Sequence, residues 1–153
     1  MRTVLAAAIV YTALTAAGAQ SQPPTATQKT ESELMKGLAA SAANPEMLTS
    51  AVSIDDRHRI NVVRRTKAAG AAAHPGFAEL HHIIDGSGTL VTGGTIVRPT
   101  GAGRGSAGAT IQNGESRHVT KGDVVLVPSG VPHWYKDVDG AAITYLEVRW
   151  EEK

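Results

Sequence analysis

The chain has 153 residues, with 15 Lys and Arg against 14 Asp and Glu, a 42% hydrophobic share and no cysteine. This length is about one domain and leaves no room for a second core. An almost neutral chain without a basic cluster argues against nucleic acid as a partner, and a chain without cysteine has no disulfide framework.

The first residues have the pattern of a secretory signal peptide. Met1-Arg2 is a short positive start, Thr3 to Ala16 is apolar and uncharged, and Ala17-Gly18-Ala19 offers an A-x-A cleavage site. The alternative is a membrane anchor, but the apolar run is shorter than the roughly 20 residues that span a bilayer. We therefore expect residues 1–19 to be cleaved and the mature protein to be periplasmic or secreted, without a membrane partner.

Residues 20–59 are expected to form a flexible leader and one short helix. Thr30 and Glu33 have the spacing of a capping box, and apolar residues follow at helical intervals. A helix to about Ala43, stopped by Asn44-Pro45, fits this pattern, with disorder as the alternative because the amphipathic pattern is weak. Leu48 to Arg59 carries no clear signal, and residues 55–58 are interpreted as a solvated connection.

From Ile60 onward, short strands alternate with tight turns. We expect strands at 60–67, 77–84, 89–91, 95–98, 124–127 and 143–150. Asn113-Gly114 and Asp139-Gly140 are typical of two-residue hairpin turns, and the glycine-rich stretch 100–114 is interpreted as a mobile loop. Many short strands at this spacing predict an all-β sandwich or barrel.

The stretch from Gly122 to Asp137 is the most informative. Val124 to Val127 is a β-branched apolar run and predicts a strand buried on both faces. Pro128 cannot donate to a ladder, so pairing should stop there, and a turn with a second proline then leads directly to His133. This rigid corner would deliver a histidine into the interior, where it suits a metal ligand.

These residues resemble the second motif of the cupin family: G, five residues, P-x-G, two residues, H, three residues, N. Gly122, Pro128, Gly130 and His133 stand at those spacings, and Asp137 stands where the family usually has Asn. The resemblance implies a double-stranded β-helix, or jelly roll, over residues 60–153.

The family's first motif runs G, five residues, H-x-H, three or four residues, E, six residues, G. His74 and Glu79 fit its second histidine and its acid, but Ala72 stands in place of the first histidine. The resemblance therefore implies a divalent metal on His74, Glu79 and His133. Two His and one carboxylate can hold Fe, Mn, Ni, Cu or Zn, so the identity of the metal stays open.

Strand parity adds candidates around this metal. Residues two apart share a face, so His81 should point the same way as Glu79, as a fourth ligand, as an acid or base above the metal, or as a pocket residue. Tyr135 should share the face of His133 and could pass a proton, or only fill the core. Arg64 and Arg65 are expected to be solvated, although one could turn inward to bind a carboxylate. His58, His82 and His118 are expected on the outside.

Two functions follow from the resemblance, and a structural cupin whose pocket is vestigial is the third alternative. The first is a small-molecule metalloenzyme of the dioxygenase, lyase or isomerase type, in which His81 and Tyr135 handle protons. The second is a cupin that binds a small ligand such as a sugar without turnover. A homodimer is expected because the sheet edges of a jelly roll must be covered.

Overall fold

The computed structural model describes residues 25–41, 46–103 and 108–152. The predicted signal peptide, the predicted stop at Asn44-Pro45 and part of the glycine-rich loop lie outside these ranges. One helix and ten strands follow in chain order: α1 (Glu31–Ala40), β1 (Met47–Ile54), β2 (His58–Arg65), β3 (Phe77–Asp85), β4 (Ser87–Thr92), β5 (Thr95–Val97), β6 (Thr110–Gln112), β7 (Glu115–Thr120), β8 (Val124–Val127), β9 (His133–Val138) and β10 (Ile143–Glu151). Within the described ranges, no helix is long and apolar enough to cross a bilayer.

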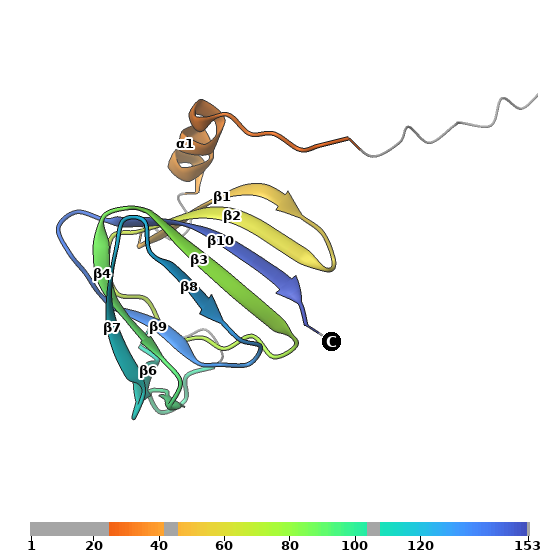
Figure 1. Ribbon diagram of the computed structural model, residues 1–153. Coiled ribbons are helices and arrows are strands. Elements are labelled where there is room, and N and C mark those ends of the chain that lie inside the picture. Colours follow the sequence, from red (N-terminus) through yellow and green to blue (C-terminus); the bar gives the residue numbers. More distant parts are fainter. Residues whose placement is uncertain (1–24, 42–45, 104–107, 153) are drawn as a thin grey trace, which may run out of the picture.

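The strands form an antiparallel jelly roll, so the all-β expectation is confirmed. Figure 1 shows a five-stranded sheet with the order β1-β2-β10-β3-β8 facing a three-stranded sheet with the order β7-β4-β9. β5 and β6 pair with each other as a separate two-stranded sheet. The interior between the two sheets holds both the core and the candidate site.

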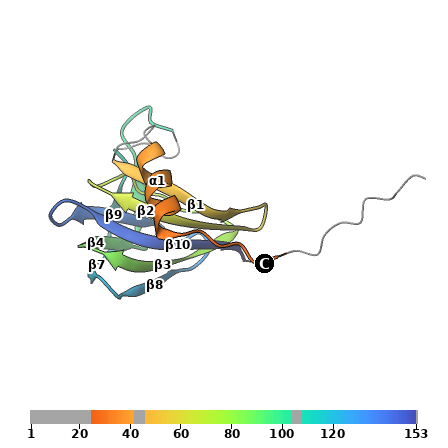
Figure 2. The same ribbon diagram turned by 90° about the horizontal axis from the view of Figure 1, so that it is seen from above.

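Helix α1 begins at the predicted capping box. The Thr30 side chain accepts a hydrogen bond from Glu33 N, and the Glu33 carboxylate accepts one from Thr30 N at 2.8 Å, which satisfies two free donors of the first turn. The helix lies over β1 and β2 (Figure 2). A side chain at Gly37 would collide with Ser50 of β1, so glycine is required for this close packing.

Strand β1 fills the stretch that carried no clear sequence signal. It pairs with β2 along its whole length, and Asp55 ends the pair by accepting hydrogen bonds from the backbone N–H of Arg57 and His58, each at 2.8 Å. The barrel sheet therefore includes a strand that precedes the one expected from Ile60. Only the short turn around Asp55 is the exposed connection that the sequence indicates.

Three local predictions are wrong for topological reasons. β8 is an edge strand that pairs only with β3, so Val124 and Leu126 are each 59% exposed instead of buried. Asn113-Gly114 and Asp139-Gly140 are not hairpin turns, because each connects strands in different sheets. At the first of these bends, a Cβ on Gly94 would lie 2.6 Å from Gly114 N. The backbone segments around Gly94 and Gly114 therefore approach so closely that glycine is needed at position 94.

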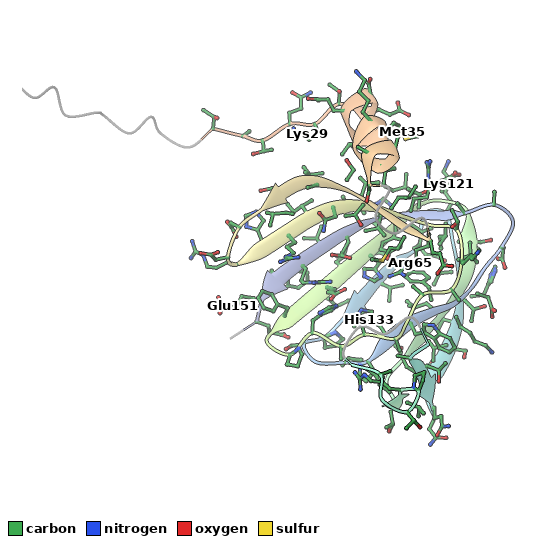
Figure 3. The ribbon with its side chains drawn as sticks, turned by 180° about the vertical axis from the view of Figure 1, so that it is seen from behind. Lys29, Met35, Arg65, Lys121, His133 and Glu151 are labelled. Carbon is green, nitrogen blue, oxygen red and sulfur yellow. The ribbon has the colours of Figure 1, made fainter. Side chains whose placement is uncertain are left out.

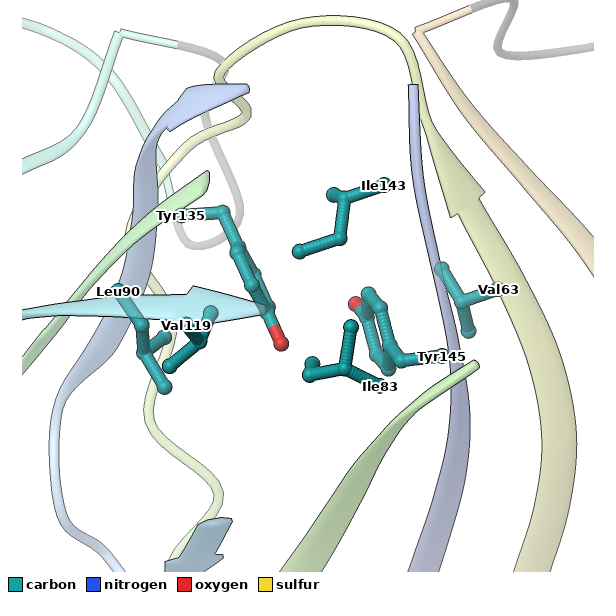
Figure 4. Packing of buried hydrophobic residues seen from close by; sticks show 7 residues of the cluster. All are labelled: Val63, Ile83, Leu90, Val119, Tyr135, Ile143 and Tyr145. Atoms are coloured by element: carbon teal, nitrogen blue, oxygen red, sulfur yellow. The ribbon is translucent and has the colours of Figure 1, made fainter. Parts of the chain in front are cut away.

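The apolar core occupies one end of the interior. Figure 4 shows Leu90 and Val119 of the three-stranded sheet opposite Val63 and Tyr145 of the five-stranded sheet. Ile83 and Ile143 have no exposed surface, and burying an isoleucine side chain contributes about 1.5–3 kcal/mol. The rings of Tyr135 and Tyr145 stack with their centroids 5.0 Å apart, which completes this end.

Candidate metal centre

The register of β2, β10 and β3 divides the interior into rows. In one row Arg149 lies between Arg59 and Glu79, and in the next row Glu147 lies between Asn61 and His81. The following row is apolar and contains Val63, Tyr145 and Ile83. Because alternate residues of a strand face the same side, one end of the barrel is polar and the other is the hydrophobic core.

Three elements bring the predicted metal ligands to the polar end. Glu79 comes from β3 and His133 from the start of β9, while His74 lies in the loop before β3. This loop is fixed at His74, whose carbonyl accepts hydrogen bonds from Phe77 N at 3.1 Å and Gly130 N at 3.2 Å. His133 is visible in the interior in Figure 3.

The three side chains converge. The Nε2 atom of His74 lies 3.2 Å from Glu79 Oε1, and the Nε2 atom of His133 lies 3.5 Å from Glu79 Oε2. One ligand atom from each residue lies within 4.8 Å of the others. Atoms bound to one ion at about 2.0–2.2 Å are separated by roughly 3 to 4.4 Å, so this cluster needs little movement to bind a metal.

The hydrogen bonds of His74 and His133 indicate which ring nitrogen of each carries the lone pair. His133 Nδ1 lies 3.1 Å from the Val131 carbonyl, which can only accept, so Nδ1 carries the proton and Nε2 the lone pair. Arg149 Nη2 lies 3.1 Å from His74 Nε2 and can only donate, so this nitrogen also carries a lone pair. The Nε2 lone pair of His133 is therefore free to bind a metal, whereas that of His74 accepts from Arg149, which a metal would have to displace from this nitrogen.

Glu79 supplies the clearest sign that a cation fits here. Its Oε1 atom is buried and accepts no hydrogen bond from any described residue. Arg149 Nε lies 2.9 Å away, yet this N–H is also unsatisfied, so the two groups attract by charge without an aligned hydrogen bond. A buried oxygen without a donor normally carries a penalty, and a metal ion would relieve it. The residues present therefore fit the divalent metal that the sequence predicts.

The charges of these groups at neutral pH are those of metal ligands. Burial opposes ionisation of Glu79, but the hydrogen bond from His81 and the nearby His133 and Arg149 together lower the pKa of Glu79 to about 2. Burial lowers the pKa of His133 to about 4, although the Glu79 charge opposes the shift, and burial also lowers the pKa of His74. At pH 7 the site therefore has one carboxylate and two neutral imidazoles.

His81 and Tyr135 lie behind Glu79. His81 Nε2 is 3.2 Å from Glu79 Oε2, and His81 Nδ1 is 3.2 Å from the Tyr135 hydroxyl. An ionised Glu79 can only accept, so His81 donates through Nε2 and Tyr135 donates to Nδ1. Burial raises the pKa of Tyr135, which keeps its proton in place. Glu79, His81 and Glu147 form a second group close enough to hold an ion, but there His81 Nε2 carries a proton.

Ala72 lies directly beside the cluster. It forms an isolated β-bridge with His133, with Ala72 N 3.0 Å from His133 O and His133 N 2.9 Å from Ala72 O. The position of the missing motif histidine therefore lines the same cavity of about 420 Å³ as the three candidate ligands. Space next to the cluster is left where a fourth imidazole would otherwise stand.

The sequence did not identify several groups in this cavity. Arg149 and Glu147 of β10 line it. Their alternation with apolar residues was the only signal in the sequence, and it did not indicate which face of the strand is internal. Arg65 turns inward, donates to the Tyr145 hydroxyl at 2.9 Å and lies 5.2 Å from the centre of the Tyr135 ring. The expectation that Arg65 is solvated was wrong, because β1 pairs with the edge of β2 and Arg65 lies on the inner face of β2 together with Asn61 and Val63.

The remaining histidines lie where the sequence placed them. His82 is exposed on the outer face of β3. His58 and His118 form ion pairs with Asp55 and Asp139 near the surface, with distances of 2.9 and 2.8 Å. None of the three takes part in the cluster.

Comparisons with known proteins support the architecture. No protein family model and no curated protein sequence matches the chain. Among solved structures, Fe(II) HppE in complex with a substrate matches with a TM-score of 0.54 and 12% identity, over 71% of this chain and 52% of that one. A predicted oxalate decarboxylase from Thermotoga maritima matches with a TM-score of 0.52 and 16% identity, over 69% and 81%. The cupin domain of Cnp3 from Schizosaccharomyces pombe matches with a TM-score of 0.51 and 12% identity, over 71% and 67%. At these identities the likeness concerns the fold.

Proposed function

The chain has the cupin fold, and on this premise we propose that it is a metal-dependent enzyme acting on a small molecule, of the oxygenase, lyase or isomerase type. The observation that carries the proposal is the convergence of two imidazoles on the buried Glu79 carboxylate: His74 Nε2 lies 3.2 Å from Oε1 and His133 Nε2 lies 3.5 Å from Oε2. The Oε1 atom accepts no hydrogen bond from the described residues. His74, Glu79 and His133 would hold the ion. A divalent ion on this ligand set acts as a Lewis acid or activates O₂ at its open positions.

The residues of the chain divide the remaining tasks. His81 holds Glu79 Oε2 through Nε2–H and thereby orients the carboxylate, and Tyr135 fixes the tautomer of His81. The small side chain at Ala72 leaves room beside the cluster for a substrate. A direct role of His81 and Tyr135 in proton transfer stays a prediction, and their contacts support a positioning role.

Metal content tests the site directly. We expect the purified mature protein to carry, or to take up, one divalent ion per chain by elemental analysis, and the variants His133→Ala and Glu79→Gln to lose it. His118→Ala is the matched control, because this histidine is 58% exposed and lies outside the cluster. Metal content that is the same in all four proteins would overturn the assignment.

Turnover separates an enzyme from a binding protein. The metal-loaded protein should be screened with phenols, diketones and sugars under air, with and without Fe(II). Turnover that disappears in Glu79→Gln supports the enzyme. Saturable binding without turnover of any bound compound would instead favour the non-catalytic ligand-binding function.

We also propose that the protein is exported and dimeric. The apolar start of the chain and its A-x-A sequence support export. The exposed Val124 and Leu126 on the edge strand β8 support pairing with a second copy. N-terminal sequencing of the protein recovered outside the cytoplasm would test the first, with a start at Gln20 as the expected result.

A further inference from the structure

A second cavity adjoins the candidate metal centre and has a markedly basic lining. It has a volume of about 480 Å³ and shares Arg59, Ala72, His74 and Arg149 with the first cavity. Arg98 adds a third guanidinium, and no Asp or Glu lines this cavity. Three guanidinium groups, of which those of Arg59 and Arg98 belong to exposed residues, thus line one space together with the candidate metal ligand His74.

The fold brings these arginines together from distant parts of the sequence. Arg59 of β2 pairs directly with Arg149 of β10, and Arg98 follows the end of β5. Within the described parts of the chain, neither Arg59 nor Arg98 forms an ion pair, whereas Arg149 contacts Glu79 at 2.9 Å and Glu147 at 3.4 Å. Like charges in one cavity repel, so this arrangement is stabilised by an anion placed between them.

We propose that this second cavity binds the anionic group of a small-molecule ligand, a carboxylate or a phosphate. Guanidinium groups recognise both through paired N–H donors. Phe77 and Pro75 supply an apolar wall for the uncharged part of the ligand. The inference deepens the proposed function, because an anionic group held beside His74 places the rest of the molecule at the metal.

Arg149 couples the two sites. It belongs to both cavities, and its closest counter-ion is Glu79 Oε1, the oxygen that the metal would use. A metal on Glu79 draws this negative charge away from Arg149 and leaves its guanidinium with more attraction for an anion. The same relation must hold in reverse, so each ligand strengthens the binding of the other.

The test begins with metal-free protein, so that it does not depend on the proposed function. Sulfate and acetate serve as probes for doubly charged oxyanions and for carboxylates, titrated at constant ionic strength and followed by NMR and calorimetry. At least one probe should bind and shift the arginine Nε–H signals of Arg59, Arg98 and Arg149. Arg98→Gln and Arg59→Gln should each weaken binding about tenfold. Arg117→Gln, an exposed arginine outside this cavity, should change nothing.

The outcomes distinguish the two proposals. Absence of binding by both probes, or equal binding by all variants, overturns the anion site even if the protein holds a metal. Binding that depends on Arg59 and Arg98 in a protein that takes up no metal supports the anion site while the metal centre fails. In a metal-binding protein, the metal should tighten the better probe severalfold, and equal affinity with and without metal would overturn the coupling through Arg149.

Discussion

The buried histidine of the cluster makes the metal-free protein sensitive to mild acid. In the unfolded chain a histidine has a pKa of about 6.5, whereas burial lowers the pKa of His133 to about 4 in the folded protein. Between these two values the unfolded state binds a proton that the folded state does not. The contribution of neutral His133 to the free energy of unfolding is therefore complete above pH 6.5, and it is lost as the pH falls from 6.5 toward 4.

The magnitude follows from the two pKa values. At pH 4.5 the unfolded His133 is almost completely protonated and the folded one only slightly, which amounts to a loss of about 2.5 kcal/mol relative to pH 7.5. The pKa of His74 is also lowered, so its contribution has the same sign. Glu79, whose pKa is lowered to about 2, adds its own loss mainly below pH 4.5, because an unfolded Glu titrates there.

Urea unfolding of the metal-free protein at pH 7.5 and 4.5 measures this loss. His133→Gln removes the titrating group, so the difference between the two pH values should shrink by about 2.5 kcal/mol in this variant. His82→Gln is the control, because His82 lies on the exposed outer face of β3, and its difference should equal that of the unaltered protein. Comparing differences, rather than absolute stabilities, removes the effect of the lost imidazole packing.

An equal difference in the His133→Gln variant and the unaltered protein would refute the reasoning. It would mean that the His133 charge is tolerated as well in the folded state as in the unfolded chain. The buried position of His133 beside Glu79 would then be wrong, and with it the basis of the candidate metal centre.

Three further predictions address neighbouring features. Tyr135→Phe leaves His81 Nδ1 without its donor, so we expect a loss of about 1–3 kcal/mol in urea unfolding and roughly tenfold weaker metal binding by calorimetry; an unchanged metal affinity would contradict the positioning role. Ala72→His places an imidazole beside His133, so Zn²⁺ should bind about tenfold tighter, or by about 1.4 kcal/mol, and weaker binding would show that the side chain does not reach the ion. Leu126→Glu adds a charge to the exposed edge strand β8, so light scattering should show a monomer with an unchanged circular dichroism spectrum, whereas a persistent dimer would place the interface elsewhere.

Turn-forming and helix-capping residues in the sequence predicted most of the fold. Gly and Pro residues marked the strand ends, the capping box at Thr30 marked the helix, and the corner before His133 marked the entry of a buried side chain. β1 was missed because its sequence mixes Ser and Thr with apolar residues and gains its order from pairing with β2. Val124 and Leu126 were misjudged because the position of a strand within a sheet depends on pairing partners that local composition does not specify.

The candidate site was predictable only in part, for a related reason. Motif spacing placed His74, Glu79 and His133, and strand parity placed His81 and Tyr135 next to them. Arg149 remained hidden because a charged residue in an alternating strand is expected to face water, and here the charged face of β10 is the inner one. Such an arrangement is recognisable only when the opposing charges from other strands are known.

The division of the interior into an apolar row and polar rows separates two demands on the same strands. Residues at one end determine whether the chain folds, and those at the other end determine what the protein recognises. Redesign for another ligand could therefore begin at the charged end, where buried partners such as Glu79 and Arg149 must be exchanged together, because a single buried charge left without its partner destabilises the fold.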